Sequence, residues 1–112
     1  MEKGQIYWVD FGIAGESEPG YRRPAMVVQS DRFNRSAIGS VMVAPLTTNL
    51  ALAKAPGNVS VDARTSGLPK NSVIVVSQIV SINKRRLDEY VSTLDPNTLF
   101  LVDNGIRLLF DL

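Results

Sequence analysis

A chain of 112 residues, with 45% apolar and 21% charged residues, is typical of one folded domain with a real hydrophobic core. This composition excludes disorder, and no apolar run approaches the roughly 20 residues that a membrane-spanning helix needs. The chain has no histidine and no cysteine, which excludes disulfides, thiolate metal sites and the commonest general base. The lack of cysteine and of a secretion signal at the N-terminus favours a cytoplasmic protein.

The net charge of +1 hides a segregation of charge along the sequence. Residues 1–20 carry a net charge of −3, residues 21–87 of +8 and residues 88–112 of −4. A basic middle with acidic ends indicates a positive face for an anionic polymer. The alternative is that these charges are simply solvated.

The hydrophobic pattern predicts short strands joined by turns. Strands are predicted over 6–11, 24–29, 40–47, 58–61, 72–80 and 89–94. The connections are a glycine-rich loop at 12–20, a helical turn within 31–36, a mobile loop at 48–55, a turn at 67–70 and a helical turn at 83–87.

One helix is predicted at the C-terminal end. Asp95 suits the N-cap and Pro96 the first helical position. Gly105 costs such a helix about 1 kcal/mol relative to alanine, which indicates close packing there. The buried stripe at helical spacing is Leu99, Val102, Ile106 and Leu109. The strands and this helix together predict a mainly β small barrel or sandwich, a single domain over residues 1–112.

The segment 20–24 (GYRRP) places two permanent cations at the mouth of a buried strand. Pro24 biases Arg23 toward an extended conformation, which helps to aim its guanidinium. Arginine presents a fork of donors that suits phosphate oxygens. The segment therefore predicts that a phosphate, and not a metal, is bound here. The alternative is a structural ion pair of Arg23 with Glu18 or Asp10.

Several segments match one known family in order and spacing. They are 4–11 (GQIYWVDF), 15–20 (GESEPG), 23–24 (RP), 31–34 (DRFN), 44–47 (APLT), 67–73 (GLPKNSV), 78–82 (QIVSI) and 84–87 (KRRL). In these segments the chain resembles the MazF/PemK toxins of bacterial toxin–antitoxin modules. Two departures are Pro19, where glutamine is common, and Arg22, where several residue types occur.

The resemblance implies an SH3-like small barrel of the MazF/PemK/CcdB type that forms a homodimer. It implies sequence-specific cleavage of single-stranded RNA, without a metal or another cofactor. The RNA's own 2′-hydroxyl attacks, leaving a 2′,3′-cyclic phosphate and a 5′-hydroxyl. It also implies a cognate antitoxin whose flexible tail occupies the RNA groove.

The resemblance further implies a catalytic pair, Arg23 and Thr47. Arg23 would stabilise the non-bridging phosphate oxygens, and Thr47 would orient the 2′-hydroxyl or hold a phosphate oxygen. The alternative for Thr47 is a strand-end residue that satisfies the backbone. The residues predicted to bind RNA are Ser17, Glu18, Arg22, Lys54, Gln78 and Arg86.

Each RNA-binding assignment has a structural alternative. Ser17 and Glu18 can contact bases, or they are loop residues that are solvated or pair with Arg22. Gln78 can read a base edge or form an internal hydrogen bond. The aromatic residues near the N-terminus, Trp8 among them, are core or interface residues more readily than stacking platforms. A set of basic residues either tracks phosphates or is simply solvated, namely Lys54, Arg64, Lys70, Lys84, Arg85 and Arg86.

Two other functions fit the same fold class. The first is a non-enzymatic CcdB-like gyrase inhibitor, whose relatives use a C-terminal Trp-Gly-Ile end. This chain instead ends in LFDL at 109–112, which counts against it. The second is a non-catalytic RNA-binding SH3-like module.

Overall fold

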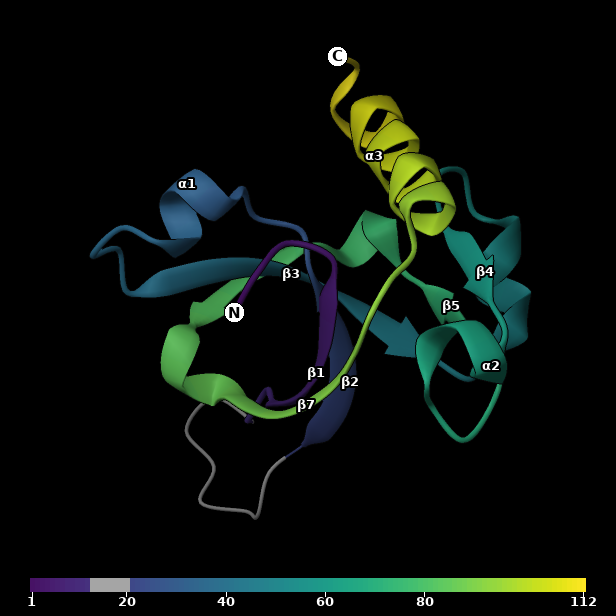
Figure 1. The fold of residues 1–112 in the computed structure, drawn as a ribbon. Coiled ribbons are helices and arrows are strands. Elements are labelled where there is room, and N and C mark those ends of the chain that lie inside the picture. The colour runs from purple at the N-terminus through teal and green to yellow at the C-terminus, as the bar shows by residue number, and fades with distance from the viewer. Residues whose placement is uncertain (13–20) are drawn as a thin grey trace.

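The computed structural model describes residues 1–12 and 21–112 and shows a mainly antiparallel β-structure with one long helix at the C-terminal end (Figure 1). The strands are β1 (Gln5–Asp10), β2 (Arg22–Val27), β3 (Ser40–Thr47), β4 (Val59–Val61), β5 (Ser72–Ile74), β6 (Val80–Asn83) and β7 (Leu87–Thr93). The helices are α1 (Asp31–Asn34), α2 (Ala63–Ser66) and α3 (Pro96–Phe110), with 3-10 turns η1 (Leu50–Lys54), η2 (Val76–Gln78) and η3 (Lys84–Arg86). The predicted fold class, mainly β with a C-terminal helix, is confirmed.

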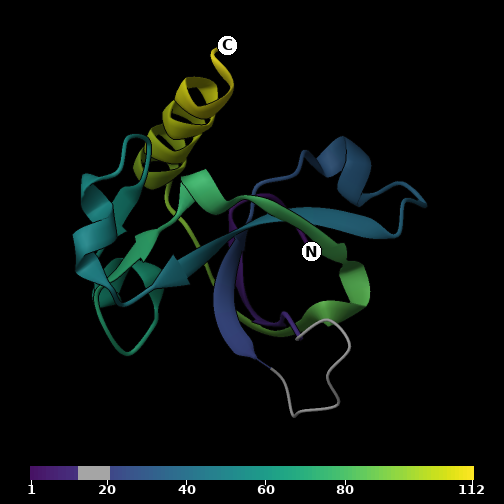
Figure 2. The same ribbon diagram turned by 180° about the vertical axis from the view of Figure 1, so that it is seen from behind.

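The strands form one sheet in the order β4-β5-β3-β2-β1-β7, and β6 also pairs with β3. In both views α3 lies over the end of the molecule that holds β4 and β5, whereas α1 lies at the opposite end of β3 (Figures 1 and 2). No helix in the described part of the chain is long and apolar enough to cross a bilayer.

Two hydrophobic clusters pack on opposite faces of this sheet, because successive side chains of a strand alternate between faces. The larger cluster includes Ile6, Met26 and Leu46 and extends to Val102 of α3. The smaller cluster consists of Val9, Ala25, Val27, Val41 and Val43.

The predicted continuous strand over 72–80 is wrong. Leu46 of β3 lies opposite Ile74 of β5, and Val43 lies opposite Val80 of β6. Between these two pairs β3 advances by three residues while its partner advances by six, and the three extra residues form η2. The apolar run is therefore bent outward at η2, as at a large β-bulge.

Two prolines explain where the sheet opens. In β3 the Pro45 carbonyl accepts a hydrogen bond from the Val75 N–H at 2.8 Å. The N–H that proline lacks would point to the same side of the strand, toward η2, so no residue of a neighbouring strand loses a hydrogen-bond donor. In β2 the pairing with β3 ends at Ala25 opposite Pro45. The next bond would need an N–H from Pro24 toward Leu46, and proline has none. The two strands therefore separate beyond Pro24.

Helix α3 begins as predicted. The Asp95 side chain accepts a hydrogen bond from the Thr98 N–H, and the Thr98 hydroxyl also bonds to it. These contacts, the hydroxyl bond first, lower the pKa of Asp95 below its ordinary value of 3.8. A lowered folded-state pKa means that the cap stabilises the fold above pH 3.8 and loses its effect as the pH falls through the folded value.

The predicted close approach at Gly105 is confirmed, because an added Cβ there would overlap the Gly57 carbonyl oxygen. Of the predicted buried stripe, Val102 is buried and Leu99 and Ile106 are half-buried. Leu109 is 42% exposed, so its assignment to the core was wrong. The last turn of α3 extends beyond the strands that cover its first turns (Figure 1).

Candidate active site

A depression of about 270 Å³ lies where β2 and β3 separate, and both Arg23 and Thr47 line it. Its polar lining residues are two cations, Arg23 and Lys70, and three hydroxyl groups. No carboxylate of the described residues lines it. A donor set of cations and hydroxyls suits an anion such as a phosphodiester. The three hydroxyl residues are Thr47, Thr48 and Ser72, and the apolar lining residues are Trp8, Pro24, Leu46, Leu68 and Pro69.

The register of the sheet explains why Arg23 and Thr47 meet. Ala25 of β2 lies opposite Pro45 of β3 in an antiparallel pair. Two residues beyond this pair, at the ends where the strands separate, Arg23 of β2 and Thr47 of β3 lie at the same height along the sheet. Because alternate residues share a face, both side chains project to the same side.

The Thr47 side chain is buried at 8% exposure, and its Oγ1 accepts a hydrogen bond from the Asn49 N–H at 3.2 Å. This bond uses an oxygen lone pair and leaves the hydroxyl proton to be donated into the depression. The structural alternative, a threonine that satisfies the backbone, is thus present together with a free donor. Both roles are compatible in one side chain.

Arg23 is half-buried and its Cζ lies 5.1 Å from the centroid of the Tyr21 ring, which is a cation–π arrangement. Among residues 1–12 and 21–112 it forms no ion pair. The carboxylate of Asp10, one of its two suggested partners, instead accepts the Gly12 N–H at 2.9 Å. The other suggested partner, Glu18, lies outside the described residues.

A second depression, of about 250 Å³, shares Arg23 with the first. Its other lining residues include the aromatic pair Phe11 and Tyr21, whose ring centroids are 6.4 Å apart, and Gln78. Gln78 is exposed at the end of η2, and in the described part of the chain its side chain forms no hydrogen bond. Arg23 therefore lies between a depression that contains cations and hydroxyl groups and a second one that contains two aromatic rings and the Gln78 amide.

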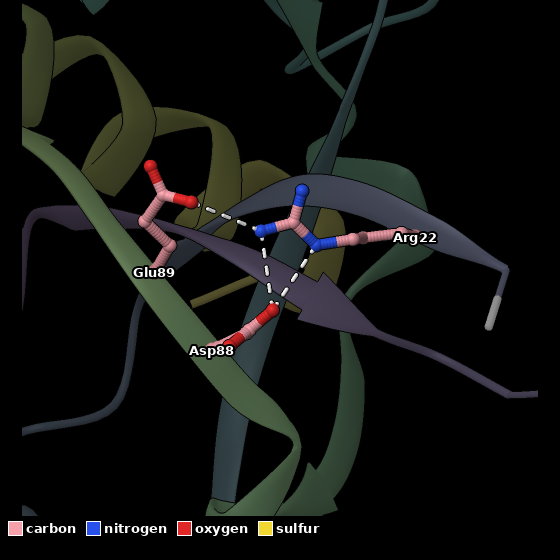
Figure 3. A network of polar contacts seen from close by, with 3 residues as sticks. All are labelled: Arg22, Asp88 and Glu89. Carbon is pink, nitrogen blue, oxygen red and sulfur yellow. Dashed lines mark hydrogen bonds and ion pairs between the residues drawn. The ribbon is translucent and has the colours of Figure 1, made fainter. Parts of the chain in front are cut away.

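Arg22 projects to the opposite face of β2 from Arg23. Its guanidinium contacts two carboxylates of β7, with Nη2 3.1 Å from Asp88 Oδ2 and 3.2 Å from Glu89 Oε1 (Figure 3). The Cζ atom also lies 5.1 Å from the centroid of the Trp8 ring. Arg22 lines neither depression that contains Arg23.

Two further predicted RNA-binding residues, Arg86 and Lys54, are described by the structure and line neither of these two depressions. Arg86 lines a separate hollow with Asp10, and its Nη1 donates to the Asp10 carbonyl at 3.1 Å. Lys54 is exposed at the end of η1. Ser17 and Glu18 lie outside the described residues.

The structure also adds two polar residues that the sequence did not single out. Ser72 lines the first depression although it is only 2% exposed, and its Oγ donates to the Lys70 carbonyl at 3.1 Å. Thr48 lines it from the residue after Thr47. The matching segment 67–73 contains Ser72, and this was the one signal available in the sequence.

Comparison with known proteins gives the family of this chain. Residues 2–110 match the family model described as PemK-like, MazF-like toxin of type II toxin-antitoxin system. The chain belongs to this family. Endoribonuclease MazF6 of Mycobacterium tuberculosis is 41% identical over 112 residues, covering all of this chain and 98% of that protein. Endoribonuclease EndoA of Bacillus subtilis is 33% identical over 108 residues, covering 96% of this chain and 92% of that protein.

The fold of this MazF-like chain is also that of solved structures. A mycobacterial endoribonuclease in complex with its cognate antitoxin superposes with a TM-score of 0.76 at 21% identity, covering all of this chain and 94% of that one. At this identity the match concerns the fold, a mainly antiparallel β half-barrel with a C-terminal helix. The resemblance stated from sequence segments is thereby confirmed at the level of family and fold.

Proposed function

We infer that the chain is the endoribonuclease toxin of a type II toxin–antitoxin pair, and we propose that it cuts single-stranded RNA at the depression lined by Arg23 and Thr47. One observation carries the proposal. A guanidinium and a hydroxyl that lie 24 positions apart in the sequence line the same depression, among cations and hydroxyls. Family membership and endoribonuclease relatives such as MazF6 support it.

The proposed reaction is a transfer within the RNA. The 2′-oxygen forms a bond to the adjacent phosphorus, and the bond from phosphorus to the 5′-oxygen breaks, leaving a 2′,3′-cyclic phosphate. Arg23 donates to the non-bridging oxygens as their negative charge increases, and Thr47 aligns the 2′-hydroxyl or holds a phosphate oxygen. The 2′-hydroxyl gives its proton to solvent water, and the 5′-oxygen gains one from Glu18 or Arg23. No metal takes part in this proposal.

The second depression is proposed to take a base beside the scissile phosphate. Its aromatic walls suit stacking, and the Gln78 amide can pair with a base edge. Ser17 and Glu18, which lie outside the described residues, remain proposed base contacts. Lys70 is proposed to contact the RNA phosphates at the first depression, and Lys54 and Arg86 to contact phosphates farther along the RNA. Affinity for RNA would then fall as the salt concentration rises.

The test is incubation of the purified protein with a long single-stranded RNA in EDTA, followed by mapping of every new end. We expect discrete cuts at a short recurring motif, with 2′,3′-cyclic phosphate and 5′-hydroxyl ends. RNA that is bound but left intact would support the non-catalytic module instead. Intact RNA together with trapped gyrase–DNA complexes would support the gyrase inhibitor.

We also propose that the toxin pairs with a second copy through α3. Phe100 is 65% exposed and Leu108 61%, and both lie on this helix with further exposed apolar residues. An uncovered apolar surface of this kind is typical of an interface. Light scattering should give the mass of two chains, and a monomer at micromolar concentration would contradict the pairing. A cognate antitoxin is proposed as the protein partner, because the mycobacterial relative was solved with one.

A further inference from the structure

Arg22 and Arg23 are adjacent in the sequence but have different electrostatic surroundings. Arg23 lines both depressions, whereas Arg22 is held by two acidic side chains from β7, across the intervening strand β1. Asp88 Oδ2 accepts from both Nε and Nη2 of Arg22, each at 3.1 Å, and Glu89 contacts the same Nη2 (Figure 3). These contacts favour one orientation of the guanidinium, since two of its nitrogens are engaged by one carboxylate.

The Arg22 guanidinium carbon lies over the indole of Trp8. The distance from Arg22 Cζ to the ring centroid is 5.1 Å, within the range of a cation–π contact. Trp8 also lies opposite Pro24 in the β1–β2 pair and packs on the larger core cluster. The indole thus contacts Arg22, Pro24 and the core, and Trp8 also lines the depression that contains Arg23 and Thr47.

We propose that Arg22, oriented by Asp88 and Glu89, positions the Trp8 indole as the aromatic wall against which an unpaired RNA base stacks next to the scissile phosphate. This inference rests on the proposed ribonuclease function. Arg22 is then a positioning residue that acts through Trp8, and not a phosphate ligand. Stacking on an aromatic ring accepts every base, so this wall adds affinity more than sequence preference.

The competing role for Arg22 is a phosphate contact, which its exposed ion pairs do not prevent, because such pairs are weak in water. The two roles differ in what Arg22→Lys does. Lysine keeps the charge and binds phosphate as a point charge, but it lacks the planar fork that meets a carboxylate while stacking on an indole. Charge is unchanged, so long-range attraction of RNA is unchanged as well.

The experiment measures binding of a 2′-O-methyl copy of the shortest RNA that the wild type cuts, since this copy cannot be attacked through its 2′-oxygen. Arg22→Lys and Arg22→Ala should both weaken binding by about fivefold or more, with an unchanged slope of affinity against salt. Arg32→Gln, an exposed arginine of α1, is the matched control and should bind as wild type. Wild-type binding by Arg22→Lys would overturn the proposal, as would a salt slope reduced by about 0.7 in Arg22→Ala.

A second readout needs no RNA, because Trp8 is the only tryptophan of the chain. Quenching of its emission by acrylamide should increase in Arg22→Ala and in the double variant Asp88→Asn/Glu89→Gln, and stay unchanged in Arg32→Gln. Unchanged quenching in both variants would overturn the positioning role. If the wild type cuts no RNA, the proposed function fails, yet this readout still shows whether Arg22 and its carboxylates hold Trp8.

Discussion

Arg23→Ala is expected to lower the rate of RNA cleavage by about 10²- to 10³-fold, the loss seen when one fixed donor to a developing oxyanion is removed. The guanidinium lines the depression beside Thr47 and is half-buried, so water replaces it poorly. Its stacking on Tyr21 fixes its direction before RNA binds. Single-turnover cleavage of the mapped RNA motif measures the loss.

The fold should survive this substitution. A partly exposed cation–π contact is worth about 0.5–1 kcal/mol, a small part of the stability of a domain of this size. Arg23→Lys should recover little activity, because an ammonium group cannot form the paired donation of a guanidinium. A folded Arg23→Ala protein that cuts RNA as fast as wild type would remove Arg23 from the reaction.

Thr47→Val is expected to lower the cleavage rate by about 10- to 100-fold, since a hydrogen bond to a charged group contributes about 1.5–3 kcal/mol. Valine keeps the shape of threonine and removes only the hydroxyl. That hydroxyl is buried beside Arg23 and has a proton to donate. The rate of the chemical step, measured with saturating protein, reports its loss.

Two variants separate this role from a structural one. Valine also leaves the Asn49 N–H without its acceptor, so a fall in melting temperature is expected for Thr47→Val. Thr47→Ser restores the hydroxyl and should recover most of the activity. Thr48→Val alters the neighbouring, exposed threonine and should have a smaller effect. If Thr47→Val and Thr48→Val slowed cleavage equally, Thr47 would have no special part in the chemistry.

Much of the fold was predictable from local pattern. The strands that became β1, β2 and β3 are apolar or aromatic runs bounded by turn residues, and the Asp95-Pro96 start of α3 is a local capping signal. These features depend on residues that are close in sequence. The resemblance then supplied the pair of Arg23 and Thr47, which no periodicity could have joined.

Two features of the fold were decided by the tertiary structure. The run 72–80 looks like one strand, but it meets two parts of β3 whose registers differ by three residues, and η2 takes up the difference. Leu109 has the spacing of a core residue, but it is 42% exposed in the folded chain. Burial depends on which element lies opposite, and this information is absent from a local pattern.

The two arginines of the segment 20–24 also separate what local sequence determines from what the tertiary structure decides. The sequence by itself determined that two permanent cations stand before a proline at the start of a strand. Only the tertiary structure decided that Arg23 faces Thr47 while Arg22 faces two carboxylates of β7. The physical reason is that neighbouring residues of a strand point to opposite faces, and their partners come from segments more than 20 residues away in the sequence.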